Sequence, residues 1–248
     1  MRFILRQQKA NTIPIPGHMD IYDNYLEIGL GAGTLSELKI KQFVRNYAQF
    51  FPTDKNAHLL DVGPGKGEML TCLSRMGYTN LQGADISESV VSHIKSLGFE
   101  GVRTLNLVEY LQSKPNYFSM ITFCDVVEHI PKDAIVSIMH AVRNSLSEDG
   151  VLIVQVPNMQ SITASIFRYD DFTHETGYTE RSLTQMLRLS GFNKIECHGF
   201  DYLDNSLRSK IQSALRSLLW KCILGSRKIN GTMPHRIQHP VLYAIVRK

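Results

Sequence analysis

The residues with the clearest capacity for chemistry lie at the end of a short apolar run, residues 57–62. Asp61 stands near the end of this run, and glycines follow at alternate positions: Gly63, Gly65 and Gly67. Residues without a Cβ let the backbone approach a ligand closely, and the N-terminus of a following helix carries partial positive charge. An apolar helical pattern follows over 67–76, so the segment predicts a strand, a ligand-binding turn and a helix.

The spacing of the glycines distinguishes between two classes of cofactor. A dinucleotide-binding turn reads G-x-G-x-x-G, but the third glycine position here holds Glu68, whose carboxylate is unfavourable beside a pyrophosphate. The pattern D-x-G-x-G-x-G instead resembles the first motif of the class I S-adenosylmethionine-dependent methyltransferases, whose cofactor has no phosphate and carries a sulfonium cation. The resemblance implies S-adenosylmethionine as the cofactor. A second copy of the pattern, Glu27–Gly33, follows a polar stretch unsuited to a buried strand, and we interpret it as part of an N-terminal cap.

Two further positions match cofactor contacts of this family. Asp85 ends an expected strand at 80–84, where its carboxylate can accept hydrogen bonds from ribose hydroxyls; the alternative is a helix-capping role. Asn106 stands where the family often has an acid that contacts the adenine amine, and an amide oxygen accepts the same bond. A turn-forming asparagine is the alternative. The resemblance assigns the neighbouring Ile86 and Leu107 to the same cofactor site.

A second informative stretch follows the fourth expected strand. It reads D-x-x-E-H-x-P and contains Asp125, Glu128 and His129; acids in such a place are also typical of the first turn of a helix. Together with Gly150–Asn158, it resembles the O-methyltransferase branch of the family, including enzymes of bacterial surface-polysaccharide modification and ubiquinone biosynthesis. The resemblance extends over about residues 57–200 and implies that Asp125 contacts the cofactor.

The chain contains neither [DN]-P-P-[YF], typical of methylation at exocyclic amines, nor the Pro-Cys pair of pyrimidine carbon-5 methylation, so a hydroxyl acceptor is favoured. His174 lies in a polar loop that, by the resemblance, faces the acceptor. We predict that His174 is the general base, because imidazole titrates near neutrality, with His129 and Glu128 orienting it or the acceptor. The alternative is a divalent metal held by Asp125, Glu128, His129 and His174. We favour the base without a metal.

The elements that must position these residues alternate between strands and helices. Expected strands are 57–62, 80–84, 101–105, 118–124, 151–156, 193–198 and 241–246. Expected helices are 35–50, 67–76, 87–97, 132–146 and 179–190. This alternation predicts an α/β fold with a mainly parallel sheet. The resemblance specifies a Rossmann-like, doubly wound seven-stranded sheet whose last strand is antiparallel.

The chain has 248 residues, of which 43% are hydrophobic, and this suits one domain with a cap. We expect a lead-in and cap helix at 1–54 and a methyltransferase domain at 55–248. Neither a signal peptide nor a membrane-spanning run is expected. Four scattered cysteines fit a reducing compartment, so we expect a cytoplasmic protein, with association to the inner face of the membrane as an open alternative.

Positive charge concentrates in residues 205–238, an expected helical insertion between strands six and seven. This segment has seven Lys/Arg and no Asp or Glu, so the net charge of +4 leaves −3 (+4 − 7) for the remainder. Apolar residues recur in it at helical spacing: Leu207, Ile211, Leu215, Leu218 and Cys222. The pattern predicts an amphipathic helix that packs on the protein or on a second copy in a homodimer, or that contacts a membrane surface through 205–228 or an anionic glycan. Nucleic acid is not expected, since aromatic residues are few in this segment.

These patterns together predict an S-adenosylmethionine-dependent O-methyltransferase. By analogy with the polysaccharide-modifying enzymes, the preferred acceptor is a hydroxyl of a sugar, surface glycan or glycolipid. The alternatives are a quinone-like phenol or natural product as the acceptor, and a catalytically inactive cofactor-binding scaffold.

Overall fold

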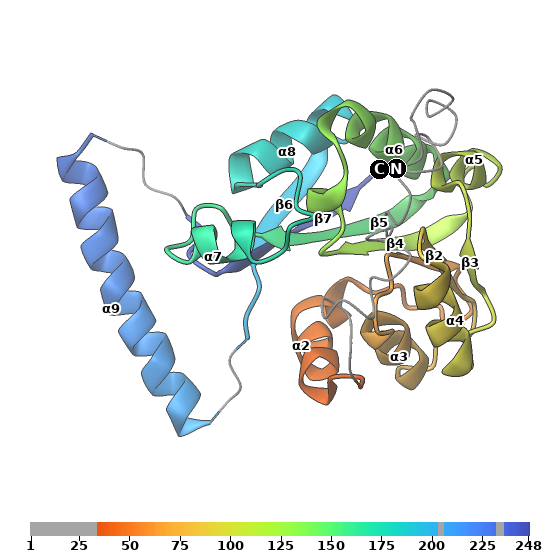
Figure 1. Ribbon diagram of the computed structural model, residues 1–248, viewed down its shortest axis with the longest axis horizontal. Coiled ribbons are helices and arrows are strands. Elements are labelled where there is room, and N and C mark those ends of the chain that lie inside the picture. The colour runs from red at the N-terminus through yellow and green to blue at the C-terminus, as the bar shows by residue number, and fades with distance from the viewer. Residues whose placement is uncertain (1–33, 203–205, 232–235) are drawn as a thin grey trace, which may run out of the picture.

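The computed structural model describes residues 34–202, 206–231 and 236–248, in which seven strands form one sheet (Figure 1). The sheet order is β3-β2-β1-β4-β5-β7-β6. The strands are β1 (Leu59–Val62), β2 (Leu81–Asp85), β3 (Val102–Thr104), β4 (Phe118–Cys124), β5 (Leu146–Pro157), β6 (Lys194–Gly199) and β7 (Val241–Arg247). Neighbouring strands are parallel except β7, which is antiparallel to both β5 and β6. The predicted sheet, with its antiparallel last strand, is confirmed.

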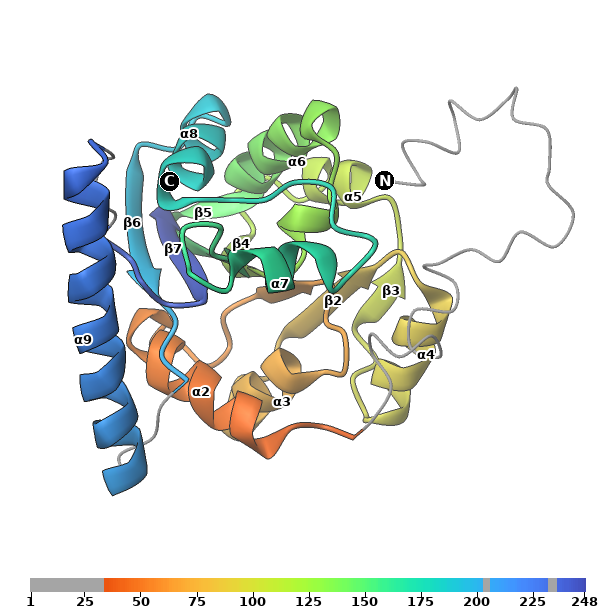
Figure 2. The same ribbon diagram turned by 60° about the vertical axis from the view of Figure 1, so that its left-hand side comes forward.

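Helices cover both faces of the sheet (Figures 1 and 2). One face carries α2 (Glu37–Tyr47), α3 (Glu68–Arg75) and α4 (Glu88–Ser96), and the other carries α5 (Leu107–Gln112), α6 (Lys132–Ser145) and α8 (Glu180–Leu189). The remaining helices of the described residues are the 3₁₀ turns η1 (Ala48–Phe50) and η2 (Val127–His129), with α7 (Ala164–Tyr169) and α9 (Leu207–Ile229). Apolar cores fill both spaces between helices and sheet, so the carboxyl ends of the strands are held rigidly.

The cap helix α2 begins at Glu37, and the hydroxyl of the preceding Ser36 caps it by accepting a hydrogen bond from the Lys39 amide at 3.2 Å. Its buried face is formed by Ile40, Phe43 and Tyr47, which follow one another at helical spacing. The helix therefore packs into the same core as the sheet. Leu38 and Val44 of the same helix are 61% and 40% exposed and lie outside this buried face.

The largest differences from the predicted elements are in β5 and α5. β5 begins at Leu146, and Phe118 pairs with Leu146 while Met120 pairs with Val151. Residues 147–150, which lie between the expected helix 132–146 and the expected strand 151–156, are thus a bulge within β5. Helix α5 was not predicted because it is only six residues long, too short to show helical periodicity. The second glycine-rich copy, Glu27–Gly33, lies outside the described residues.

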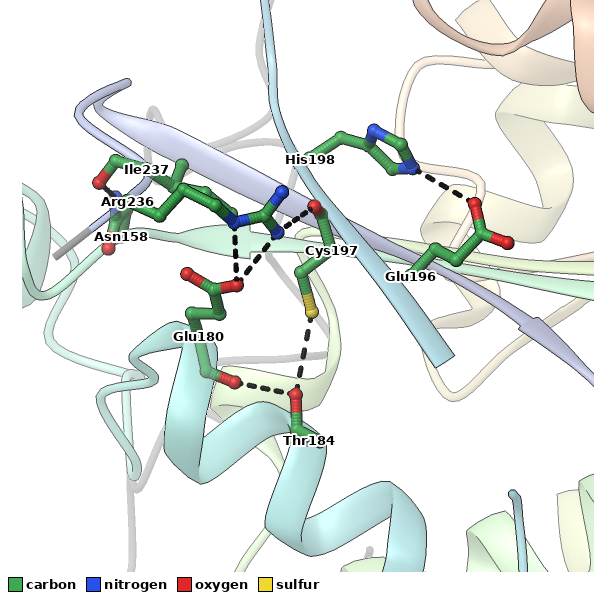
Figure 3. A network of polar contacts seen from close by, with 8 residues as sticks. All are labelled: Asn158, Glu180, Thr184, Glu196, Cys197, His198, Arg236 and Ile237. Atoms are coloured by element: carbon green, nitrogen blue, oxygen red, sulfur yellow. Dashed lines mark hydrogen bonds and ion pairs between the residues drawn. The ribbon is translucent and has the colours of Figure 1, made fainter. Parts of the chain in front are cut away.

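The predicted insertion between β6 and β7 contains one long helix, α9, whose flanking segments are bonded to the body of the protein. On the N-terminal side, Asp201 pairs with Arg45 at 2.9 Å. On the C-terminal side, Arg236 donates to the Glu180 carboxylate at 2.8 Å and to the Cys197 carbonyl at 2.7 Å (Figure 3). The insertion is therefore attached at both ends. Among the described residues, no helix is long and apolar enough to cross a membrane.

Candidate active site

A cavity of about 470 Å³ lies at the carboxyl ends of β1, β2 and β4. Its walls come from α2, from the turns that follow β1 and β2, and from residues 105–108 and 124–130. Loops diverge at this edge of a parallel sheet, and doubly wound folds bind ligands there. The predicted site residues on its walls are Asp61, Gly63, Gly65, Asp85, Ile86, Asn106, Leu107, Asp125 and His129. The other predicted residues, Gly67, Glu128 and His174, are not among the described residues that line it.

The turn between β1 and α3 depends on its glycines. Gly63, Gly65 and Gly67 have φ angles of 68°, 53° and 88°, in the left-handed region that side chains disfavour. A Cβ on Gly63 would lie 2.5 Å from a methyl of Val126, and one on Gly67 would lie 2.9 Å from a methyl of Ile94. A Cβ on Gly65 would meet no described protein atom within 4 Å. The first and third glycines therefore permit packing, whereas the second faces space that a ligand can use.

Two carboxyl groups stand near the ends of β1 and β2: Asp61 is buried, and Asp85 is half-buried. Asp61 is 2% exposed and accepts a hydrogen bond from the Thr122 hydroxyl at 2.6 Å, while its Oδ2 has no partner among the described residues. Burial raises the pKa of Asp61 to about 7 and that of Asp85 to about 6. Asp85 accepts a hydrogen bond from the Ser87 amide at 2.8 Å. Both carboxyls are thus available to ligand donors that favour their ionised forms.

Asn106 and Asp85 each combine two of the roles that the sequence left open. The Asn106 side chain accepts a long hydrogen bond, 3.4 Å, from the Glu109 amide and so caps α5, and Asp85 stabilises the turn into α4. Both residues also line the cavity. A local structural role therefore does not remove either residue from the ligand site.

Sequence reasoning missed a polar network beneath the cap helix. Lys39 of α2 lies 3.8 Å from the Asp125 carboxylate, and the Gln155 amide donates to both oxygens of Asp125 at 2.9 and 2.8 Å. The Tyr47 hydroxyl in turn donates to Gln155. Burial lowers the pKa of Lys39, but the carboxylates of Asp125 and Glu68 outweigh it and the net shift is upward. Lys39 stands alone on a predicted helix, and Gln155 lies within a predicted buried strand, so neither carried a motif that could reveal the network.

Glu128, His129 and His174 come together in the folded chain, although residues 130–173 separate the last from the others. One side-chain ligand atom from each lies within 4.8 Å of the other two, and the imidazole rings are 4.7 Å apart. Glu128 is 2% exposed, and neither carboxyl oxygen has a partner among the described residues. Burial, with a smaller effect of Asp125, raises its pKa well above the ordinary value. Asp125 is not in this group, so three of the four residues proposed as metal ligands are gathered.

The loop that carries His174 is held to η2 by its backbone. The Glu128 carbonyl accepts hydrogen bonds from the amides of Glu175 and Thr176 at 2.8 and 3.0 Å. Arg168 of α7 donates to the His174 carbonyl at 2.7 Å. These contacts join segments far apart in the sequence. Because they use main-chain groups, no pattern of residue types predicts them.

A chain of hydrogen bonds fixes the state of His129. Thr173 Oγ1 lies 2.6 Å from Asp171 Oδ1 and 2.8 Å from His129 Nδ1. A hydroxyl has one hydrogen, which the carboxylate requires, so His129 Nδ1 is assigned as the donor to Thr173 and Nε2 is left as the acceptor. Burial lowers the pKa of His129, and His174 lowers it further. The neutral imidazole is therefore favoured, with a lone pair on Nε2.

Comparison with known proteins places this site in a family. A family model described as a methyltransferase domain matches residues 35–197, more than half of the chain. The chain belongs to the class I S-adenosylmethionine-dependent methyltransferases. The match begins beside the cap helix and ends in β6, so it includes the cavity and all the predicted site residues.

The relatives of this methyltransferase are distant. Ubiquinone biosynthesis O-methyltransferases from two Neisseria meningitidis strains, of serogroups C and A, are 25% identical over 113 and 109 residues. The aligned region is 42% of this chain and 45% of the serogroup C protein, and 40% and 44% for serogroup A. The chain thus spans less than half the length of the curated relatives it matches.

The solved structures share the fold of the methyltransferase. An S-adenosylmethionine-dependent methyltransferase from Archaeoglobus fulgidus superposes with a TM-score of 0.66 at 20% identity, covering 92% of this chain and all of that one. Phosphoethanolamine N-methyltransferase 2 from Haemonchus contortus, solved with S-adenosylmethionine, gives 0.59 at 14% identity and covers 94% and 60%.

The cavity residues of the methyltransferase fit the family cofactor, S-adenosylmethionine. The open space at Gly65 leaves room against the glycine turn, and Asp61 Oδ2 is a buried acceptor without a partner among the described residues. The described wall has more acids than bases: Asp61, Glu68, Asp85 and Asp125 against Lys39 and Lys66. An acidic, partly apolar cavity suits a cation with ribose and adenine groups better than it suits a phosphate.

Proposed function

We propose that this methyltransferase transfers the methyl group of S-adenosylmethionine to an acceptor hydroxyl, with His129 as the general base. The observation that carries the proposal is the Asp171–Thr173–His129 chain of hydrogen bonds, which leaves Nε2 of a cavity-lining imidazole able to accept a proton. A hydroxyl is a weak nucleophile until its proton is removed, and a positioned imidazole is suited to remove it.

The residues of the cavity walls support the following cofactor contacts. Asp85 accepts hydrogen bonds from the ribose hydroxyls, and the backbone of Gly63 and Gly65 lies along the amino-acid portion, while Gly67 shapes the turn from behind. Ile86, Asn106 and Leu107 bind the adenine, and Asp61, with Asp125 and Lys39, surrounds the charged amino-acid end. When bound, the cofactor supplies an electrophilic methyl on a sulfonium. The protein residues position the acceptor oxygen for in-line attack, and positioning is expected to provide most of the acceleration.

The two histidines have different roles in this proposal. The sequence-based prediction assigned the base role to His174, but His129 lines the cavity and has the assigned tautomer, whereas His174 stands behind it at 4.7 Å. We therefore assign proton acceptance to Nε2 of His129. His174 supports this ring, and the Glu128 carboxyl, near both imidazoles, balances the positive charge that proton uptake creates when it is itself ionised. The metal-bound alternative needs Glu128, His129 and His174 as ligands.

A sugar hydroxyl on a glycan or glycolipid is our proposed acceptor. The segment that leads to His174 has partly or fully exposed acids, Asp170, Asp171 and Glu175, beside two exposed aromatic rings, Tyr169 (79% exposed) and Phe172 (89%). Carboxylates accept hydrogen bonds from hydroxyls, and aromatic faces pack on the apolar face of a sugar ring. A phenol of a quinone precursor is the second candidate, and the similarity to ubiquinone biosynthesis O-methyltransferases supports it.

An acceptor screen that measures S-adenosylhomocysteine release tests the proposal with sugar-containing and phenolic compounds in parallel. With the active acceptor, His129→Ala should lower turnover by roughly two to four orders of magnitude and leave cofactor affinity unchanged. His140→Ala on the exposed surface of α6 is the matched control. Activity that a chelator abolishes and Mg²⁺ or Mn²⁺ restores would reject the base mechanism in favour of a metal. Transfer to amines alone would reject the hydroxyl acceptor.

A further inference from the structure

Helix α9 turns its most apolar side away from the protein. Five residues on one face, which we call the leucine face, are between 53% and 87% exposed: Leu207, Ile211, Leu215, Leu218 and Ile229. They succeed one another at spacings of three, four and eleven residues, which place them along one stripe of a helix. An amphipathic helix that merely packed on its own protein would bury this stripe, and α9 does not.

The side of α9 that contacts the body is less apolar. Trp220 is buried and lies beneath the Arg227 guanidinium, and Ser209 is buried on the same side. Trp220 and Arg216 share a small cavity, about 110 Å³, with residues 161–163, Gln238 and Pro240. The contact with the body, together with the attachments at Arg236 (Figure 3) and at Asp201, sets the rotation of the helix. The leucine face is therefore held outward by the fold.

Cationic side chains border the leucine face. Lys210, Lys221 and Lys228 are exposed and are separated by eleven and seven residues, so they lie along one margin of the stripe. Arg208 lies on the opposite margin. None of the ion pairs between described residues involves these four side chains, and residues 205–238 contain no acid. An apolar stripe between such cations matches the boundary between acyl chains and anionic headgroups.

We propose that α9 docks the enzyme on the surface of an anionic phospholipid bilayer, with the leucine face in the acyl boundary and Lys210, Lys221 and Lys228 at the headgroup phosphates. The helix is the outermost element on the β6 side of the molecule in both views (Figures 1 and 2), so a flat surface can reach it. With 23 residues it extends about 35 Å along that surface. It lies on the bilayer and does not cross it, in agreement with its hydropathy.

The charges disfavour a second copy of the chain as the occupant. Two leucine faces in contact would bring the lysine margins of both helices together, and neither helix has an acid to pair with them. Like charges at such a seam are repulsive. Anionic lipid supplies the missing negative charge, and docking does not depend on which acceptor the enzyme methylates.

The test is sedimentation of the full-length protein with vesicles. One set contains phosphatidylcholine alone, and the other contains phosphatidylcholine with about 30% phosphatidylglycerol. Two triple variants each change one feature of α9. The variant Lys210→Glu/Lys221→Glu/Lys228→Glu reverses the charge of the lysine margin. The variant Ile211→Ser/Leu215→Ser/Leu218→Ser makes the leucine face polar. Lys95→Glu/Lys132→Glu/Lys194→Glu makes the same charge change at exposed sites on α4, α6 and β6. Thermal shift with S-adenosylhomocysteine verifies that each variant is folded and binds cofactor.

We expect wild type and the Lys95 control to bind anionic vesicles, with affinity that falls as salt rises. Both α9 variants should lose affinity by roughly tenfold or more while keeping wild-type cofactor binding. Equal binding of wild type to both vesicle sets, or wild-type binding by either α9 variant, would overturn the proposal. A wild-type dimer that the serine variant converts to a monomer, or retention of wild type by dextran sulfate with no vesicle binding, would also overturn it, in favour of a self-contact or a soluble polyanion.

Discussion

Replacement of Asp61 by asparagine should make the protein more stable at alkaline pH while weakening its cofactor site. Asp61 is almost completely buried, and its pKa is raised from the ordinary 3.8 to about 7, chiefly by burial. A carboxyl with a raised pKa binds its proton more tightly in the folded state. Its contribution to stability is therefore full below about pH 4 and is lost progressively as the pH rises through about 7.

The magnitude follows from the difference of about three pKa units. At 1.36 kcal/mol per unit, the folded wild type loses at most about 4 kcal/mol of stability between acid and alkaline pH through this group. The asparagine amide retains an oxygen that can accept the hydrogen bond from the Thr122 hydroxyl, but it carries no proton to lose. We therefore expect the stability of Asp61→Asn relative to wild type to rise by roughly 2–4 kcal/mol between about pH 4.5 and pH 8.

Urea unfolding at several pH values measures this change. The difference between pH values removes any effect of the substitution on the free energy of unfolding that does not depend on pH. Asp133→Asn, at an exposed position on α6, is the matched control. A variant whose stability relative to wild type is the same at both ends of the pH range would refute the reasoning. Calorimetry at alkaline pH should show weaker S-adenosylmethionine binding by the variant, because it lacks the carboxylate beside the cation. A stability gain with undiminished affinity would leave the electrostatic account of stability standing and remove Asp61 from the cofactor site.

Three further expectations concern the cofactor cavity. Asp85→Ala should weaken S-adenosylhomocysteine binding by roughly 2–3 kcal/mol, the scale of charge-assisted hydrogen bonds, and calorimetry that finds wild-type affinity would show that the ribose lies elsewhere. Wild-type affinity should rise with pH through about 6, because burial raises the pKa of Asp85 to that value and the ionised form accepts the ribose hydroxyls; a flat profile in isothermal titration would contradict this. Gly65→Arg should abolish binding by filling the open space at the turn, whereas Gly225→Arg on α9, where a Cβ also meets no described atom, should bind normally in a thermal-shift assay.

The sequence predicted most of the fold because each core element carried a local pattern. Apolar runs marked the strands, and glycines marked the ends of α3, α4 and α8, where Gly77, Gly98 and Gly191 have positive φ angles. The bulge in β5 was not predictable, since it depends on which β5 residue pairs with Phe118 of β4. That pairing is a tertiary contact, which no local pattern specifies. The helix α5 was not predictable either, because six residues are too few to show a helical period.

The lining of the cavity was more predictable than the proximity of His129 and His174. The glycine turn and Asp85 lie within one strand–turn–helix pattern each, so their motif and their geometry coincide. The proximity of His174 to His129 depends on main-chain bonds from Glu128 to the later loop, and the assigned tautomer depends on Thr173. Side-chain motifs contain no information about such contacts, which arise only from tertiary folding.

The bonds from the Glu128 carbonyl to the amides of Glu175 and Thr176 have a consequence for how this enzyme can diversify. Main-chain donors and acceptors are common to nearly every amino acid, so the attachment persists when most side chains of the attached loop are exchanged. Mutation at Phe172 or Glu175 can then change which molecules are admitted without displacing the histidine pair. Under the proposed mechanism, a new acceptor preference could evolve in this loop while His129 and His174 keep their relative positions.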